Sequence, residues 1–452
     1  MCGFLVYKTE KPLWNQQIQV LTEALGHRGL ETSIYNRNGA FVIHNVLPMT
    51  SLKKNEYKQP LTDPRWGPDF VGAFSGEIFN WKELKDKYGF VSENDSQLFT
   101  DFITKSGSMG ALHECDGFWN YSAIASGELI GIVDYLSQKP LYYRTDMPAI
   151  CSEPYPLTLL GETTKDDLFF ASLPKFGYEV TGMTAWKEIK QMPPGSYYVD
   201  GEIKPYWDWS KVEDIDLEEG LFKSVEARLG GEREAAILLS GGLDSSIIHN
   251  IASRFNPDIK CFHVENGEEE YVKLLTDNYE KIDLSNYSVS KEEAMRRNQT
   301  PVDLGSVLPQ AQLADSLKNK GIHVVLSGDG ADELFSGYKR NNHYDSQHSD
   351  IFQELPYYHN PRLDRMMMGS VVELRAPFMA SYIVKHALSL DFNKRKGKKC
   401  LKRLFKGVLP NEIIDRDKLA LKSKEVRTSS KRDNAIKNIK LFLEIFKIHE
   451  GK

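Results

Sequence analysis

The chain has 452 residues, which suggests about two to four domains at roughly 100–200 residues per domain. Apolar residues make up 41% and charged residues 27%, a balance that excludes a disordered or fibrous chain. The formal net charge of -6 does not suit a protein that coats nucleic acid, so we expect no nucleic-acid partner.

The cysteines are five in number, widely spaced and without a CxxC pair: Cys2, Cys115, Cys151, Cys261 and Cys400. Such a set favours neither a disulfide framework nor a zinc site, so we expect a reducing, cytoplasmic location. No apolar run approaches the roughly 18 residues of a membrane span. The first residues also become charged too early for a secretory signal, and we expect no membrane partner.

The N-terminal half is predicted to form stacked antiparallel sheets, because short apolar runs alternate with turn residues. The expected strands are residues 4–7, 40–44, 70–74, 121–125, 129–133 and 195–199. Helical spacing is present at 16–25 and 96–103. Asp200 and Gly201 predict a two-residue hairpin turn, and the aperiodic stretch 205–216 is interpreted as a linker.

From residue 217 onward strands alternate with helices, a pattern typical of a parallel sheet with right-handed crossovers. The expected strands are 235–239, 261–264 and 322–326, and the expected helices are 217–229, 247–254 and 311–318. We therefore predict a multidomain α/β protein with two domains, 2–206 and 207–452.

The string SGGLDSS occupies residues 240–246, directly after the first of these strands. Its glycines let the backbone approach a ligand, and its amides, hydroxyls and following helix N-terminus form an anion site. Asp244 has a role there if it holds a divalent cation. The structural alternative is a glycine turn with a serine N-cap; the lysine-containing GxxxxGK string of a Walker loop is absent.

A second loop, after strand 322–326, carries Asp329, Asp332 and Glu333 within five positions. Crowded carboxylates need a metal, a proton or a basic partner, unless the loop is a solvated acidic turn. Loops that follow parallel strands meet at one edge of the sheet. Asp244 and Asp332 are therefore predicted to share one Mg²⁺ with the phosphates of ATP.

Cys2 becomes the N-terminal residue if Met1 is removed. Its own α-amino group, with a pKa near ~7.7–8, can then act as the base for the thiol, so that one residue supplies nucleophile and base. The alternative is a cysteine without function at position two. Three strings favour the first interpretation: LGHRG at 25–29, SGEIFN at 75–80 and ENDSQ at 93–97.

Together with LSGDGADELFSGY at 326–338, these strings resemble the glutamine-dependent asparagine synthetase family, over almost the whole chain. The resemblance implies an N-terminal class II glutamine amidotransferase domain, an αββα sandwich of the N-terminal-nucleophile hydrolase type. It implies a C-terminal ATP-pyrophosphatase synthetase domain with a parallel sheet. Both expectations agree with the strand patterns of the two halves.

The resemblance also implies residue roles. Cys2 would attack the side-chain amide of glutamine, which would be held by Leu47, Pro48, Met49, Ser75, Gly76, Glu77 and Asp95. ATP would contact Leu239, Ser240, Gly241, Gly242, Asp244, Ser245, Ser246, Val264, Ser327 and Gly328. Asp329 would help form an acyl-adenylate, and Lys418 would stabilise charge on the transferred phosphate.

Three positions depart from the family pattern. Ser75 replaces an asparagine that helps form the oxyanion hole, and losing such a donor can cost about 2.7–4 kcal/mol in the transition state. Val46 replaces an arginine that pairs with the α-carboxylate of glutamine, and Arg28 is a candidate substitute. Ala380 replaces an aspartate after the string ELRAPFM at 373–379.

The implied activity is an ATP-dependent, glutamine-hydrolysing amide ligase. ATP adenylates a carboxylate, with aspartate as the first candidate, and ammonia from glutamine reaches it through an apolar passage between the domains. One alternative is another acceptor, such as a sugar acid, a peptide or a small metabolite. The other is a degenerate nucleotide-binding regulatory homologue. A homodimer is a further possibility for the assembly. The basic stretch 394–406 is interpreted as a helix that faces phosphate or is simply solvated.

Overall fold

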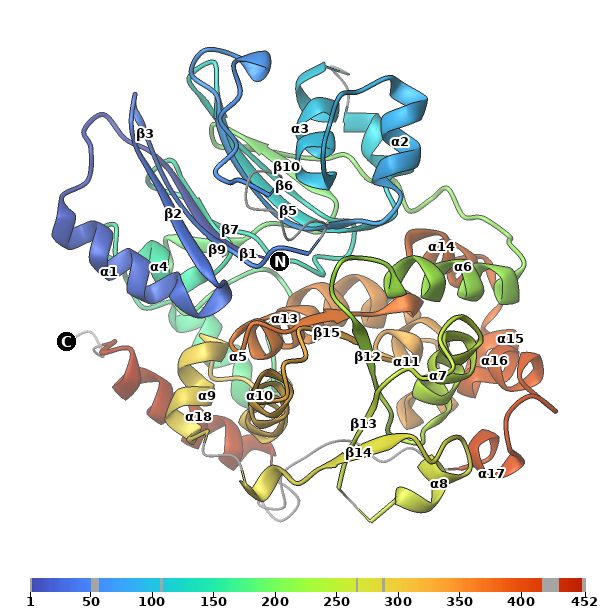
Figure 1. The fold of residues 1–452 in the computed structure, drawn as a ribbon. Helices are drawn as coiled ribbons and strands as arrows, with labels where there is room; N and C mark the ends of the chain where they lie inside the picture. The colour runs from blue at the N-terminus through green and yellow to red at the C-terminus, as the bar shows by residue number, and fades with distance from the viewer. Residues whose placement is uncertain are drawn as a thin grey trace.

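The computed structural model describes residues 2–49, 57–105, 109–265, 267–286, 289–416 and 431–448. Its strands form three sheets (Figure 1). The first sheet has the order β2-β3-β1-β8-β7-β9, and the second β11-β10-β6-β5-β4. All strand pairs in these two sheets are antiparallel.

The strands of the first sheet are β1 (Cys2–Lys8), β2 (Glu31–Arg37), β3 (Ala40–Val46), β7 (Tyr142–Arg144), β8 (Ala149–Cys151) and β9 (Ile189–Gln191). Those of the second are β4 (Val71–Ile78), β5 (Gly117–Ala125), β6 (Glu128–Val133), β10 (Ser196–Val199) and β11 (Glu202–Pro205). The helices of this half are α1 (Asn15–Leu25), α2 (Trp81–Tyr88), α3 (Asp95–Lys105), α4 (Pro154–Thr158) and α5 (Asp167–Phe176).

Alternating side chains of the strands build the layers of this half. Phe4 and Val6 of β1 pack between the two sheets, against Val71 and Ala73 of β4. Leu5 points to the opposite face, where it belongs to the core cluster that α1 covers. On the far face of the second sheet, α3 packs against β4. The order helix, sheet, sheet, helix is the predicted αββα sandwich.

The third sheet is parallel, with the order β14-β13-β12-β15-β16. Its strands are β12 (Ala235–Leu238), β13 (Cys261–Val264), β14 (Tyr279–Ile282), β15 (Val324–Leu326) and β16 (Glu373–Arg375). The helices are α6 (Leu217–Leu229), α7 (Leu243–Phe255), α8 (Glu269–Lys273), α9 (Lys291–Asn298), α10 (Leu304–Asn319), α11 (Ala331–Leu334), α12 (Gln347–Ser349), α13 (Asn360–Met368), α14 (Ser381–Ser389), α15 (Phe392–Arg395), α16 (Lys399–Leu404), α17 (Asn411–Ile414) and α18 (Lys431–Ile445). A π-helix, Asp350–His359, precedes α13.

The start of β1 lies at the centre of the molecule, where the antiparallel sheets meet the C-terminal half (Figure 1). The last helix returns to the N-terminal half, because α18 packs against α5 and Phe442 contacts the rings of Phe170 and Trp186. The two halves are therefore in contact through several segments that are far apart in sequence.

The predicted fold class is confirmed, and two details differ from the sequence-based prediction. The helix expected at 247–254 begins at Leu243, inside SGGLDSS, because Gly242 in an extended conformation serves as its N-cap. The strands β2, β7, β8, β9, β14 and β16 were not predicted, whereas β11 completes the hairpin expected at Asp200 and Gly201. Most of them are short, and β2 is largely exposed, so their apolar pattern is weak. In the described part of the chain, no helix has the length and apolar character needed to cross a membrane.

Candidate active sites

Cys2 is the first residue of β1, and its side chain is buried. Its backbone N–H donates to Ser75 Oγ at 3.1 Å, and the Ser75 hydroxyl donates to the Cys2 carbonyl at 2.8 Å. Burial raises the pKa of the Cys2 thiol, while a hydrogen bond with the backbone of Leu47 lowers it. The thiol therefore needs a base, which the α-amino group of Cys2 can supply once Met1 is removed.

Ser75 and Gly76 lie beside Cys2 on β4. The hydroxyl proton of Ser75 is used by the Cys2 carbonyl, so in this structure it is not directed at a bound amide as an oxyanion donor would be. Gly76 has φ of 153°, and a Cβ there would lie 2.1 Å from the Phe118 carbonyl oxygen. Only glycine fits this close approach of two strands.

Two buried carboxylates, Glu77 and Asp95, lie in the same region. Asp95 accepts backbone N–H groups of Ile78 at 3.2 Å and Ser96 at 2.8 Å. Burial raises the pKa of Glu77, Glu373 and Asp95 raise it further, and Arg375 at 4.0 Å lowers it only in part. Two acids in a buried site suit a ligand ammonium group.

The backbone strip of Leu47, Pro48 and Met49 is also buried and follows β3 directly. Arg28, the candidate replacement for the arginine missing at Val46, is not available to glutamine. Its side chain is fully buried, with Nη1 2.9 Å from Glu153 and Nη2 2.8 Å from Asp364. Because both ends of the guanidinium are paired with acids, the suggestion that Arg28 substitutes is wrong.

The string predicted to bind nucleotide, residues 240–246, follows β12. The Ser240 backbone N–H donates to Ser245 Oγ at 3.2 Å, and the hydroxyls of Ser245 and Ser246 donate to the Gly242 carbonyl. Gly241 has φ of 71°, which turns the chain so that the amides of the first turn of α7 face the loop. Leu239 is buried after β12, and Val264 ends the neighbouring strand β13.

The loop after β15 packs against this string. A Cβ on Gly328 would lie 2.6 Å from the Asp244 Cβ, so glycine is required where the loops meet. Ser327 donates its hydroxyl proton to Asp329 at 2.7 Å. Since β12 and β15 are adjacent parallel strands, their loops lie at one edge of the sheet, as the sequence predicted.

Asp244 and Asp332 converge on a cation, but that cation is the ammonium of Lys398. Its Nζ lies 2.6 Å from a carboxylate oxygen of each acid. Burial alone would lower the pKa of Lys398, but the two acids raise it overall. Two carboxylates fit Mg²⁺ when substrate phosphates complete its shell. Among the described residues, no three His, Cys, Asp or Glu side chains gather as a self-sufficient metal site.

Two family models match the chain. The model "Glutamine amidotransferase domain" matches residues 1–207, and "Asparagine synthase" matches 216–360 and 344–438. The chain belongs to the glutamine-dependent asparagine synthetase family. Members of this family use ATP, which agrees with the nucleotide role predicted for the loop after β12.

Asparagine synthetase B of Escherichia coli (strain K12) is 25% identical, over 92% of this chain and 80% of that protein. The glutamine-hydrolyzing asparagine synthetase 1 of Bacillus subtilis is 26% identical, over 75% of this chain and 59% of that protein. A solved glutamine phosphoribosylpyrophosphate amidotransferase from B. subtilis is 13% identical, with a TM-score of 0.33, over 93% of this chain and 99% of that chain.

Sequence reasoning missed several residues that the structure places at the two candidate sites. Lys398 was included only in the basic stretch 394–406, although a cation was expected near the acids. Arg416 donates to the Gly241 carbonyl at 2.9 Å. Glu373 and Arg375 of β16 reach the surroundings of Glu77 from the other half. Lys418 lies outside the described residues.

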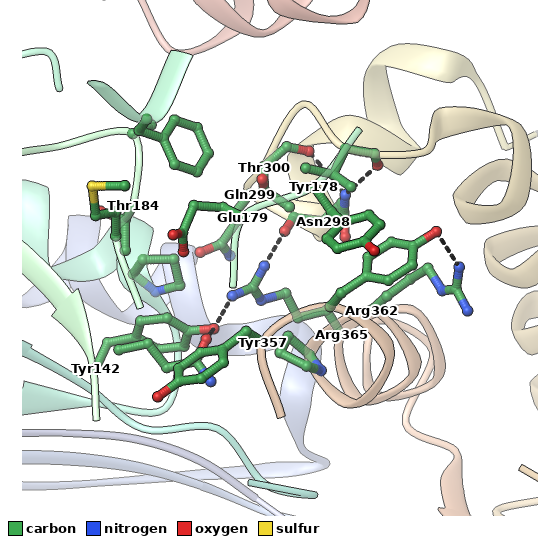
Figure 2. A pocket seen from close by; sticks show the side chains of 18 residues that line it. Tyr142, Tyr178, Glu179, Thr184, Asn298, Gln299, Thr300, Tyr357, Arg362 and Arg365 are labelled. Carbon is green, nitrogen blue, oxygen red and sulfur yellow. Dashed lines mark hydrogen bonds between the residues drawn. The ribbon is translucent and has the colours of Figure 1, made fainter. Parts of the chain in front are cut away.

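A cavity of about 50 Å³ lies between the two halves of the asparagine synthetase-like chain (Figure 2). Tyr142 and Tyr178 come from the N-terminal half, and Asn298, Arg362 and Arg365 from the C-terminal half. Arg365 donates to the Asn298 carbonyl at 2.5 Å and also to Tyr142. In the described structure, Arg365 Nε and Asn298 Oδ1 are buried without a hydrogen-bond partner.

Proposed function

We propose that this protein is a glutamine-hydrolysing, ATP-dependent amide synthetase, with aspartate as the first candidate acceptor and asparagine as the product. The observation that carries the proposal is the setting of Cys2. Its thiol forms a hydrogen bond with the backbone of Leu47, and its backbone nitrogen donates to the hydroxyl of Ser75. The buried acids Glu77 and Asp95 lie nearby. In the proposed division, residues 2–206 release ammonia and residues 207–452 use it. We also propose that the enzyme works in the cytoplasm, in line with its five unpaired cysteines.

In the first half-reaction, the Cys2 thiol attacks the side-chain amide carbon of glutamine, and the Cys2 α-amine takes the thiol proton once Met1 is removed. The amine then passes that proton to the leaving ammonia, and water hydrolyses the thioester to glutamate. The strip of Leu47, Pro48 and Met49 orients the substrate. Ser75 and Gly76 border the thiol, and Glu77 and Asp95 bind the substrate ammonium.

In the second half-reaction, a carboxylate attacks the α-phosphate of ATP, forming an acyl-adenylate and releasing pyrophosphate. Residues 240–246 cradle the phosphates, while Leu239, Val264, Ser327 and Gly328 line the nucleotide. Asp329 faces the new acyl bond, and Lys418 is assigned to the transferred phosphate. Asp244 and Asp332 would hold Mg²⁺, which supplies charge neutralisation on the phosphates when bound.

Ammonia needs a route between the two half-reactions that does not protonate it. A cavity of about 20 Å³ lies between the halves, with Phe118, Leu363, Met367, Met368 and Met379 in its lining. These side chains offer no acid to protonate a passing ammonia molecule. The cavity therefore supports an internal passage. The one acid in its described lining, Asp364, is paired with Lys139 and Arg28.

The lining of the cavity in Figure 2 supports the alternative of another carboxylate acceptor, such as a sugar acid. The tyrosines and arginines of its lining suit a hydroxylated anion. The charge of Asp329 raises the pKa of Arg362, which lines the cavity. The cavity therefore lies close to the proposed acyl-transfer site. A non-catalytic nucleotide-binding role is a further alternative, because Ser75, Val46 and Ala380 depart from the family pattern.

The test is product analysis with ATP, Mg²⁺, glutamine and one acceptor at a time. With aspartate we expect AMP, pyrophosphate, glutamate and asparagine. Cys2→Ala should abolish the glutamine-dependent reaction and keep the ammonia-dependent one. AMP formation with a sugar acid but not with aspartate would support the alternative acceptor. A protein that makes AMP with no acceptor and hydrolyses no glutamine would contradict the synthetase assignment.

A further inference from the structure

Glutamine carries an α-carboxylate as well as an ammonium group, and the proposed site needs a partner for each. Glu77 and Asp95 are suited to the ammonium, but an anion beside them needs a cation. The end of β3 provides none, because residue 46 is valine and its side chain is buried. The missing cation must come from another part of the fold.

Two nearby arginines are already engaged. Arg28 is held between Glu153 and Asp364. Arg375 donates from Nε to Glu373 at 2.5 Å, and its Nη1 donates to the carbonyls of Arg228 and Gly230. Arg28 cannot accept a new carboxylate without breaking these buried contacts, which is costly. The remaining Nη2 group of Arg375 lies 4.0 Å from Glu77, on the side proposed for the ammonium.

Arg233 belongs to the turn between α6 and β12, in the C-terminal half, yet it contacts the glutamine strip. Its Nε donates to the Pro48 carbonyl at 2.8 Å. The backbone N–H of the preceding residue, Glu232, donates to the Met49 carbonyl at 3.2 Å. Pro48 directly follows Leu47, whose backbone bonds to the Cys2 thiol. The Cys2 thiol and the Arg233 guanidinium therefore contact neighbouring residues of the same strip, Leu47 and Pro48.

Among the residues that the structure describes, none forms an ion pair with Arg233, and its two Nη groups have no hydrogen-bond partner. Burial lowers the pKa of Arg233, and the more distant Glu373 offsets this only in part. A half-buried guanidinium whose Nε is anchored and whose Nη groups are available is a ready carboxylate site.

We propose that Arg233 binds the α-carboxylate of glutamine, in place of the arginine that Val46 removes. This inference rests on the proposed glutaminase function. It means that the glutamine site is completed by a residue of the synthetase half. Glutamine then binds tightly only while the turn 230–234 is docked on the strip 47–49, so that ammonia release depends on the assembled enzyme.

The experiment compares Arg233→Gln with the unmodified full chain in glutamine hydrolysis. One charged hydrogen-bond pair contributes about 1.5–3 kcal/mol, so the KM for glutamine should rise roughly 10- to 150-fold. The KM for L-glutamine α-amide, which lacks the carboxylate charge, should not change. Arg233→Lys should give an intermediate KM, because it keeps the charge and loses the fork geometry.

The controls separate binding from structural damage and from failure of the proposed function. Arg254→Gln, on the surface of α7, should leave every constant unchanged. If Arg233→Gln lowers activity equally with glutamine and with its α-amide, the residue only supports the strip and the proposal is overturned. An unchanged KM for glutamine also overturns it, while the glutaminase function stands. If the unmodified enzyme hydrolyses no glutamine, or Cys2→Ala still does, the proposed function fails and this inference fails with it.

Discussion

At the scale of single residues, Ser75 is a substitution with a structural role of its own. Where relatives of this family are expected to carry asparagine, the serine hydroxyl bridges the nitrogen and the carbonyl of Cys2, at 3.1 and 2.8 Å. After removal of Met1, that nitrogen would be the catalytic base. The hydroxyl thus holds the base beside the thiol instead of facing the oxyanion.

Ser75→Ala is therefore expected to lower kcat for glutamine hydrolysis about tenfold, the value of one hydrogen bond of about 1.4 kcal/mol. Ammonia-dependent synthesis should not change, since the second half-reaction does not use this residue. The measurement is steady-state kinetics with each nitrogen source. Ser122→Ala, which removes another buried hydroxyl bonded to a backbone carbonyl on the same sheet, is the control. Equal effects of the two variants would contradict the role given to Ser75.

At the scale of elements, the loops after β12 and β15 depend on the short segment between α15 and α16. Lys398 has φ of 60°, a left-handed conformation that costs a lysine about 1 kcal/mol or more. It is held there while its ammonium joins Asp244 and Asp332. The pairing keeps the two acids together before any substrate binds.

Lys398→Met is expected to make the stability of the enzyme depend on Mg²⁺. Without the ammonium, the two acids repel each other, and a divalent cation can replace it. Thermal unfolding should show a lower Tm for the variant in metal-free buffer and a larger gain on adding Mg²⁺ than for the unmodified protein. Lys399→Met removes an exposed charge of the same segment and serves as the control. The same Mg²⁺ response in all three proteins would count against this role.

At the scale of the whole molecule, a buried ionic network joins the two halves. Asp364 of α13 pairs with Arg28 at 2.8 Å and with Lys139 at 2.7 Å, and Glu153 also binds Arg28. Burial raises the pKa of Asp364, but the two cations lower it overall. The network lies beside the smaller cavity, so it supports both the docking of the halves and the wall of the proposed passage.

Asp364→Ala leaves two buried cations without this partner and is expected to lower the free energy of unfolding by about 3–5 kcal/mol. Denaturant unfolding measures this change, and Glu202→Gln, in an exposed pair with Lys204, should leave the midpoint unchanged. Burial raises the pKa of Glu153, but His27 and Arg28 lower it overall to about 2. The stability that this carboxylate contributes to the folded state is therefore present above pH 4.5 and is lost as the pH falls toward 2. A change near zero for Asp364→Ala would show that the network is not needed to hold the halves together.

Much of the fold was predictable because its signals are local. The apolar runs of β1, β3 and β4 and the strand-loop-helix pattern around SGGLDSS mark the two kinds of sheet. The short strands β7, β8 and β9 were not predictable, because three residues carry too little pattern. They become strands only through pairing with neighbours that are distant in sequence.

The sequence by itself determined the chemistry of the two sites, since Cys2, the acids and the glycine loops are local strings whose residue types dictate what they can bind. Only the tertiary structure decided which charges remain available. Arg28 is used within the core and Lys398 lies between the acids expected to hold a metal, whereas Arg233 crosses from one half to contact the strip of the other. Ion pairing depends on distances of a few ångströms between distant segments, and residue spacing along the chain does not contain that information.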